Sequence, residues 1–236
     1  MKALEIKNLH AWYGESHILH QLEFSVEQGE VVTLLGRNGA GRTTTLRSIM
    51  GLVGKRQGSI KINGIESIAL PTHKIAHLGV GYCPEERAIF STLSTKENLL
   101  LPPVITSAHA EQAMSLADIY AMFPNLKERE GSQGTRLSGG EQQMLAVARI
   151  LRTGAKLLLL DEISEGLAPV IVQALANMIK VLKAKGYTIV MVEQNFRFAA
   201  PLADRFLVVE HGQLVEEFTA GQLSEKMPVL TTLLGV

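Results

Sequence analysis

The sequence carries no excess of either charge. Lysine and arginine together number 23, as do aspartate and glutamate, so the formal net charge is zero. A chain without net charge has no long-range field to draw it non-specifically onto nucleic acid or anionic lipid. We therefore expect no nucleic-acid partner, and any recognition of phosphate must come from a local arrangement of residues.

Long apolar runs and cysteine are equally scarce. The apolar run at residues 157–160 has the length of a strand and ends in two acidic residues, whereas a membrane-spanning helix needs about 20 apolar residues. The one cysteine, Cys83, cannot form an internal disulfide, and no charged-then-apolar leader opens the sequence. These absences predict a protein of the reducing cytoplasm, and if it serves a membrane we expect it to lie beside the bilayer.

Short runs of alternating polar and apolar residues, at 3–7 and 22–27, predict antiparallel strands near the amino terminus. Residues 31–35 instead form an almost wholly apolar run, of the kind buried in a parallel sheet, and a glycine loop and a helix at 44–50 follow it. We expect further strands at 58–63, 79–82, 157–160, 188–192, 206–210 and 213–217, and helices at 72–77, 108–123, 140–151 and 170–184, with a short helical tail.

Strands that alternate with helices predict an α/β fold whose parallel sheet is covered on both faces. The strand pattern is absent from residues 95–154, which we interpret as an inserted helical lobe. The predicted organisation is therefore a single domain over residues 1–236. Its α/β core comprises residues 1–94 and 155–236, with an antiparallel β layer at the start.

The loop after the first buried strand is rich in glycine. Residues 36–43 read Gly-Arg-Asn-Gly-Ala-Gly-Arg-Thr and match the phosphate-binding loop pattern at every position except Arg42, where lysine is expected. Glycines let the chain curl so that backbone N–H groups point inward, and the following helix adds the positive end of its dipole. The alternative is an ordinary glycine-rich turn. The predicted nucleotide-binding residues here are Gly36, Asn38, Gly39, Ala40, Gly41, Arg42, Thr43 and Thr44.

Two residues of this loop have a more specific expected chemistry. The hydroxyl of Thr43 is placed to bind Mg²⁺. Arg42 keeps the positive charge of the usual lysine but replaces a compact ammonium with a broad planar fork, and the space beneath the β and γ phosphates is tight. We predict that ATP binding survives this replacement while turnover falls.

Two acids end the buried strand at residues 157–160. Ligands of open parallel sheets bind at the carboxyl ends of the strands, and adjacent residues of a strand point in opposite directions. Asp161 therefore suits a contact to Mg²⁺ through water, and Glu162 suits polarising the water that attacks the γ-phosphate. The alternative is a charged pair that merely ends a strand at the surface.

A Leu-Ser-Gly-Gly-Glu-Gln-Gln segment at residues 137–143 opens a predicted helix. Ser138 is expected to cap that helix, and Gly139 and Gly140 leave its amino end accessible to an anion. A Ser-Gly-Gly turn before a helix is common by itself. Its place between the glycine loop and the acidic strand end argues against coincidence.

Together with the glycine loop, this segment resembles the signature sequence of the ABC ATPase family, and the resemblance covers essentially the whole chain. It implies a P-loop NTPase (RecA-like) parallel sheet core with an antiparallel β layer and an inserted α-helical subdomain, binding ATP and Mg²⁺. It also implies a head-to-tail dimer in which Ser138, Gly139 and Gly140 close over the partner's ATP. Tyr13 resembles the aromatic residue that stacks on adenine, although packing against the strand layer is the alternative.

Several positions depart from the general family pattern. Glu85 stands where a glutamine usually links the Mg²⁺ site to the transmembrane partner, Gln194 where the switch histidine is usual, and Ala168 where aspartate is common. Ile163 stands where proline is usual. Glu85, Ala168 and Gln194, with their neighbours, resemble the smaller ATP-binding subunit of branched-chain amino acid importers, and Ile163 is a further difference. Gln194 can bond a phosphate oxygen but cannot titrate, so no histidine-like pH dependence is expected from it.

The resemblance also implies partners and a location. They are transmembrane permease subunits, a second ABC ATPase subunit, and indirectly a periplasmic or extracellular solute-binding protein, at the cytoplasmic face of the inner membrane. An apolar patch within residues 86–101, with Phe90 and Leu93, is expected to receive a permease helix, or else to close the lobe's own core. The dimer partner is the same chain or, as the importer resemblance favours, a related one.

Three functions remain open from the sequence. The first is an energy-coupling importer ATPase, and the second is a nucleotide-gated subunit whose hydrolysis Arg42 impairs. The third is an ABC protein of translation or DNA repair, which usually has tandem ATPase domains or a long coiled-coil insertion that this chain lacks. The transported solute is not identified, and urea, amides and other amino acids stay open.

Overall fold

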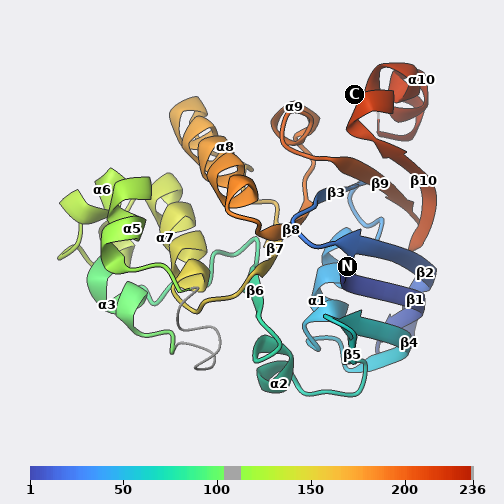
Figure 1. Ribbon diagram of the computed structural model, residues 1–236, viewed down its shortest axis with the longest axis horizontal. Coiled ribbons are helices and arrows are strands. Elements are labelled where there is room, and N and C mark those ends of the chain that lie inside the picture. The colour runs from blue at the N-terminus through green and yellow to red at the C-terminus, as the bar shows by residue number, and fades with distance from the viewer. Residues whose placement is uncertain (104–112, 235–236) are drawn as a thin grey trace.

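The computed structural model describes residues 1–103 and 113–234, which form two sheets with helices around them (Figure 1). The larger sheet has the strand order β10-β9-β3-β8-β7-β6, in which β10 is antiparallel to β9 and the other neighbours are parallel. Its strands are β3 (Val31–Leu35), β6 (Val80–Cys83), β7 (Leu157–Asp161), β8 (Thr188–Val192), β9 (Arg205–Glu210) and β10 (Gln213–Thr219). The predicted parallel core is confirmed.

The smaller sheet is antiparallel and has the order β2-β1-β4-β5. Its strands are β1 (Lys2–Tyr13), β2 (Ser16–Glu27), β4 (Lys55–Ile62) and β5 (Ile65–Glu66). The two long strands extend well beyond the runs predicted at 3–7 and 22–27. The register shifts between Ile6 and Leu9, beside Asn8 with its positive φ of 48°, interrupt the alternation from which a strand is predicted.

The helices of the described chain are α1 (Arg42–Ile49), α2 (Thr72–Ala76), α3 (Thr95–Leu100), α5 (Leu116–Met122), α6 (Pro124–Glu128), α7 (Gly139–Leu151), α8 (Pro169–Ala184), α9 (Phe196–Ala199) and α10 (Leu223–Leu234), with 3₁₀ turns at Gly134–Arg136 and Ala220–Gln222. Helices α3, α5, α6 and α7 gather on the side away from the antiparallel sheet (Figure 1). That residues 95–154 form a distinct lobe stays a prediction.

The helix predicted at 108–123 is wrong at residues 113–115, which are not helical. The structure begins α5 at Leu116, because the Ser115 side chain and the Asp118 carboxylate cap each other's backbone N–H groups and fix the start there. Residues 104–112 lie outside the described part of the chain. Helices α3, α6 and α9 are short and were not predicted individually.

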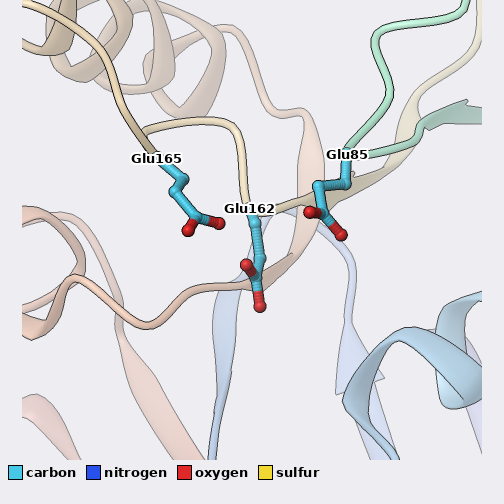
Figure 2. A group of neighbouring side chains, drawn as sticks. All are labelled: Glu85, Glu162 and Glu165. Carbon is cyan, nitrogen blue, oxygen red and sulfur yellow. The ribbon is translucent and has the colours of Figure 1, made fainter. Parts of the chain in front are cut away.

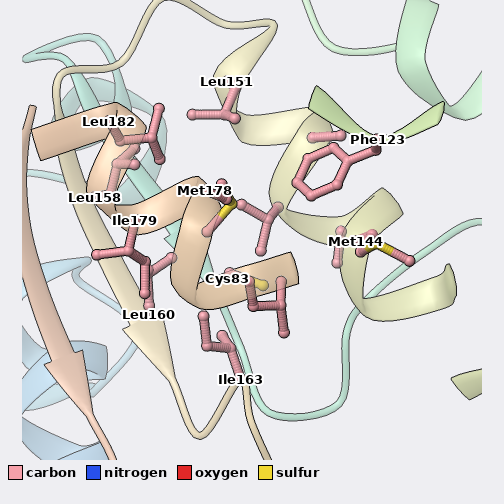
Figure 3. Close-up of a cluster of buried hydrophobic side chains, with 14 of the residues drawn as sticks. Cys83, Phe123, Met144, Leu151, Leu158, Leu160, Ile163, Met178, Ile179 and Leu182 are labelled. Carbon is pink, nitrogen blue, oxygen red and sulfur yellow. The ribbon is translucent and has the colours of Figure 1, made fainter. Parts of the chain in front are cut away.

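Apolar residues fill both faces of the parallel sheet. Between β7, α7 and α8 lies a cluster that includes Leu158, Leu160, Met144 and Met178, shown in Figure 3. Cys83 is buried in the same cluster, and burial raises the pKa of its thiol to about 12, so it serves as an apolar residue of the core. Within the described residues, no helix combines the length and hydropathy needed to span a bilayer.

Candidate functional site

A cavity of about 340 Å³ lies at the carboxyl ends of β3, β7 and β8. In a parallel sheet this edge is where loops leave the strands, and it is the expected place for a ligand. The residues lining the cavity are Asn38, Gly39, Ala40, Gly41, Arg42, Thr43, Thr44, Glu85, Glu162, Glu165 and Gln194. The structure therefore brings together most of the predicted phosphate loop and both predicted catalytic side chains.

The loop has a backbone that only glycine allows at two of its positions. Gly41 has φ 105° and an added Cβ would lie 2.8 Å from Leu19 Cδ2, while a Cβ at Gly36 would lie 2.4 Å from the Val209 carbonyl oxygen. Helix α1 begins directly after Gly41, which has no side chain to cap it. Among the described residues, the N–H groups of its first turn have no side-chain or intrahelical acceptor, and they suit an anion.

The predicted metal ligands on this side of the site converge. The Thr43 hydroxyl donates to Asp161 Oδ1 at 3.0 Å, and the Tyr82 hydroxyl donates to Asp161 Oδ2 at 3.2 Å. Asp161 is fully buried, and this burial, with Glu162 and Glu85 nearby, raises its pKa to about 6. A buried carboxylate beside a hydroxyl and further acids is a donor set that fits Mg²⁺, which prefers hard oxygen ligands.

Glu85 reaches the same cavity from the loop after β6. Its carboxylate lies with those of Glu162 and Glu165, and one oxygen from each falls within 4.8 Å of the others (Figure 2). The three side chains come from two separate loops and point toward a shared space. Negative charge is thus concentrated at this end of the sheet.

Glu162 is held in one orientation by several groups. Its φ of 48° is in the left-handed region, and its backbone N–H donates to the Val192 carbonyl at 2.8 Å, which ties the residue to β8. Gln194 Nε2 donates to both carboxylate oxygens at 3.2 and 3.1 Å, and to Asn38 Oδ1 at 2.6 Å. The predicted catalytic pair therefore does lie in contact, with Gln194 between Glu162 and the phosphate loop.

Arg42 is the loop residue whose position the sequence could not indicate. Its side chain is 4% exposed and points back at Glu162, whose Oε1 accepts from the Arg42 NH2 group at 3.0 Å. The NH1 group donates to the Glu193 carbonyl at 3.0 Å. Burial lowers the pKa of Arg42, and Glu162 and its acidic neighbours oppose that shift.

Four polar residues of the site were missed from the sequence: Tyr82, Ser164, Glu165 and Glu193. Ser164 donates through its N–H and its hydroxyl to the two oxygens of the buried Glu193 carboxylate, at 3.2 and 2.7 Å. Burial raises the pKa of Glu193 to about 7. Both residues follow the carboxyl ends of neighbouring parallel strands. Their position at that shared edge is the feature of the sequence from which their contact could be predicted.

Other predicted residues lie outside this cavity. Tyr13 ends β1 and is 42% exposed. Ser138 caps α7 and shares a capping box with Glu141, while an added Cβ at Gly140 would meet Ile171 Cγ1 at 2.6 Å. None of these residues lines the cavity, so contact of the 138–140 segment with a nucleotide stays a prediction that requires a second chain.

The apolar patch predicted within residues 86–101 is only partly exposed. Phe90 is 46% exposed and lies under the Arg149 guanidinium, 4.7 Å from the ring centre, whereas Leu93 is half-buried. Phe90 therefore does not belong to the interior of the helices around it. Its role as a contact for a permease stays a prediction.

Comparison with known proteins agrees with this geometry. The family model described as ABC transporter matches residues 19–165. The chain is 39% identical over 232 residues to the high-affinity branched-chain amino acid transport ATP-binding protein BraG of Pseudomonas aeruginosa, covering 98% of this chain and 99% of the relative. It is 32% identical to the lipopolysaccharide export system ATP-binding protein LptB of Escherichia coli, covering 100% and 98%.

Solved structures with the same fold include an ATP-binding subunit of an ABC transporter, with 28% identity, a TM-score of 0.81, and coverage of 96% of this chain and 94% of that chain. The ADP conformation of an ATP-binding cassette matches with a TM-score of 0.80 and 22% identity, covering 100% of both chains. These likenesses extend over the antiparallel layer, the parallel core and the helices between them.

Proposed function

The chain belongs to the ABC transporter family and is a transport-coupled ATPase, and from that premise we propose that it is the energy-coupling subunit of an importer for branched-chain amino acids. The observation that carries the proposal is the 39% identity to BraG over nearly the full length of both proteins. Identity to the lipopolysaccharide export protein LptB is lower, at 32%. The Glu-Gly-Leu-Ala-Pro segment at 165–169, which resembles importer subunits, supports the same choice.

In this proposal the phosphates of ATP bind the backbone amides of residues 36–44 and the positive end of α1. Thr43, Asp161 and Glu85 would hold Mg²⁺, which when bound neutralises charge on the β and γ phosphates. Glu162 accepts a hydrogen bond from the attacking water and Gln194 orients the Glu162 carboxylate through its contacts to both oxygens. Tyr13 stacks on the adenine.

The proposed site is completed by a second chain. The amino end of α7, with Ser138, Gly139 and Gly140, closes over the nucleotide held by the partner. In support, these residues do not line this chain's own cavity. The partner is a second ABC ATPase subunit, related or identical. The dimer works on permease subunits at the cytoplasmic face of the inner membrane, and a solute-binding protein delivers the amino acid.

One observation favours a variant of this function, a nucleotide-gated subunit with slow hydrolysis. Arg42 stands at the lysine position of the phosphate loop and contacts the proposed water-polarising residue, Glu162, at 3.0 Å. Steady-state ATP hydrolysis by wild type and by Arg42→Lys distinguishes the two. Equal rates remove the slow-hydrolysis variant, and a large gain in Arg42→Lys establishes it.

Transport tests the importer proposal directly. The chain is purified with its membrane partners from native membranes and reconstituted in vesicles with its solute-binding protein. We expect uptake of labelled leucine that needs ATP, and no uptake when the chain carries Glu162→Gln. ATP hydrolysis that is stimulated by lipopolysaccharide or another solute, but not by leucine, would reject the importer assignment. It would leave the ATPase assignment intact.

A further inference from the structure

The proposed site has one cation, and the chain itself supplies an anion for it. Among the described residues lining the cavity, Arg42 is the only lysine or arginine, while Glu85, Glu162 and Glu165 are acidic. The Arg42 and Glu162 side chains are 4% and 8% exposed and lie 3.0 Å apart. Such a pair is shielded from water, so its strength is not screened as that of a surface pair is.

We propose that Glu162 and the phosphates of the nucleotide compete for the guanidinium of Arg42, so that nucleotide binding releases the Glu162 carboxylate for catalysis. The inference deepens the proposed function and rests on it. Arg42 is thereby a positioning residue with two successive partners, the carboxylate before binding and phosphate oxygens after it.

The fork of an arginine makes this exchange specific to the present sequence. One arm, NH1, donates to the main-chain carbonyl of Glu193 at 3.0 Å, while the other arm, NH2, donates to Glu162. The NH2 group also lies 3.4 Å from Asn38 Oδ1 in the phosphate loop. A lysine at this position donates from a single point and has no planar fork, so it cannot hold these acceptors in the same geometry.

Release of Glu162 matters because of what the pairing does to it. A carboxylate that accepts a charge-assisted bond from a guanidinium is a weaker acceptor for a water molecule. Phosphate oxygens match the same guanidinium well, so they can replace the carboxylate without stranding the buried cation. Gln194 contacts both Glu162 oxygens and keeps the carboxylate in place after the exchange.

A double-mutant cycle on nucleotide affinity tests the competition. The dissociation constant of MgADP, which is not hydrolysed, is measured by titration calorimetry for wild type, Glu162→Gln, Arg42→Lys and the double variant. We expect Glu162→Gln to tighten MgADP binding about tenfold, because the competing anion is gone. In the Arg42→Lys background the same change is expected to alter affinity less than about threefold.

The control is Glu165→Gln, which changes an acidic side chain of the same cavity that, in the described structure, makes no hydrogen bond to Arg42. It separates general charge repulsion from competition for the guanidinium. The inference would be overturned if Glu162→Gln and Glu165→Gln tightened MgADP binding equally. It would also be overturned if Glu162→Gln tightened binding equally in the wild-type and Arg42→Lys backgrounds. If neither wild type nor any variant bound MgADP or MgATP, the proposed function would be rejected, and the inference with it. Thermal unfolding of each variant verifies that it is folded.

Discussion

Two arginine–glutamate pairs lie near opposite ends of the same parallel sheet, and they differ in how their charges are balanced. Arg205, at the start of β9, contacts both oxygens of Glu30 at 2.8 and 3.0 Å and also contacts Glu217 and the Ser25 carbonyl. Arg42, beyond the end of β3, pairs within the described part of the chain with Glu162 alone, although Asp161, Glu165 and Glu193 are also close.

The environments act on the two guanidinium groups in opposite directions. Bonding to Glu30 raises the pKa of Arg205, whereas burial lowers that of Arg42. The Arg205 network joins β9, β10 and the loop before β3, and it is complete within the chain. At the other end of the sheet, the described acidic side chains around the cavity outnumber the basic ones. Such an imbalance is expected of a site that binds a metal cation together with a nucleotide.

The largest effect that would sharpen this contrast is on hydrolysis. Replacing Glu162 with glutamine removes the proposed water-polarising group, and we expect ATP hydrolysis to fall by about 100- to 1000-fold. Glu217→Gln makes the matched change in the Arg205 network and is expected to leave turnover within about twofold. Phosphate release at saturating MgATP measures both. Similar losses of hydrolysis in Glu162→Gln and Glu217→Gln would contradict the view that one end of the sheet is catalytic and the other structural.

The reverse experiment concerns stability. Arg205→Met leaves Glu30 and Glu217 without their shared cation, and we expect it to lower the free energy of unfolding by about 2 to 3 kcal/mol, below the value for a wholly buried pair because the side chain is still 16% exposed. Urea unfolding measures the change. MgADP affinity of the folded variant should match wild type, and a substantial affinity loss would show that the two ends are not independent.

Glu193 predicts a pH dependence of stability at the site end. Its folded-state pKa of about 7 lies above its usual value of 4.5, so the folded protein holds the proton more tightly than the unfolded chain does. Stability from this group is present at low pH and is lost as the pH rises through about 7. The free energy of unfolding of Glu193→Gln, minus that of wild type, should therefore be about 2 kcal/mol larger at pH 8 than at pH 5.

Urea unfolding of both proteins at the two pH values, without nucleotide, checks this expectation. Glu217→Gln serves as the control because Glu217 is bonded to Arg205 at the other end of the sheet. A difference between wild type and Glu193→Gln that stays constant with pH would mean that Glu193 is ionised throughout.

The smallest effect concerns the Tyr82 hydroxyl, which donates to Asp161 Oδ2. Tyr82→Phe removes one hydrogen bond and keeps the ring, so the loss of stability should be about 1 kcal/mol. Because Asp161 is a proposed Mg²⁺ ligand, the Mg²⁺ concentration for half-maximal hydrolysis should rise by less than about tenfold. An unchanged Mg²⁺ requirement would assign Tyr82 a purely structural role.

Local patterns in the sequence predict the elements around the site well. The continuous apolar runs at 31–35 and 188–192 coincide with β3 and β8 because both strands are buried on both faces. The start of α5 also had a local signal, the Ser115 and Asp118 capping box, which the helical periodicity of the preceding residues masked. Where pattern and cap compete, the cap sets the boundary.

The connections within the site could not be predicted in the same way. Arg42 and Glu162 are separated by 120 positions, and their contact depends on β3 and β7 lying on either side of β8. The sequence predicts which residue types meet at this edge of the sheet. It does not predict that the phosphate-loop cation turns toward an acid of the chain, since that depends on the side-chain conformation of Arg42.

Whether the amides of residues 36–44 bind phosphate is tested by where a nucleotide protects the backbone. Hydrogen–deuterium exchange, followed by mass spectrometry with and without MgADP, reports on the amides themselves. We expect slowed exchange concentrated in residues 36–44, where the amides cradle the phosphates, and unchanged exchange around Glu30 and Arg205. Saturating MgADP that leaves residues 36–44 unprotected, or protects only the Glu30 and Arg205 end, would contradict this expectation.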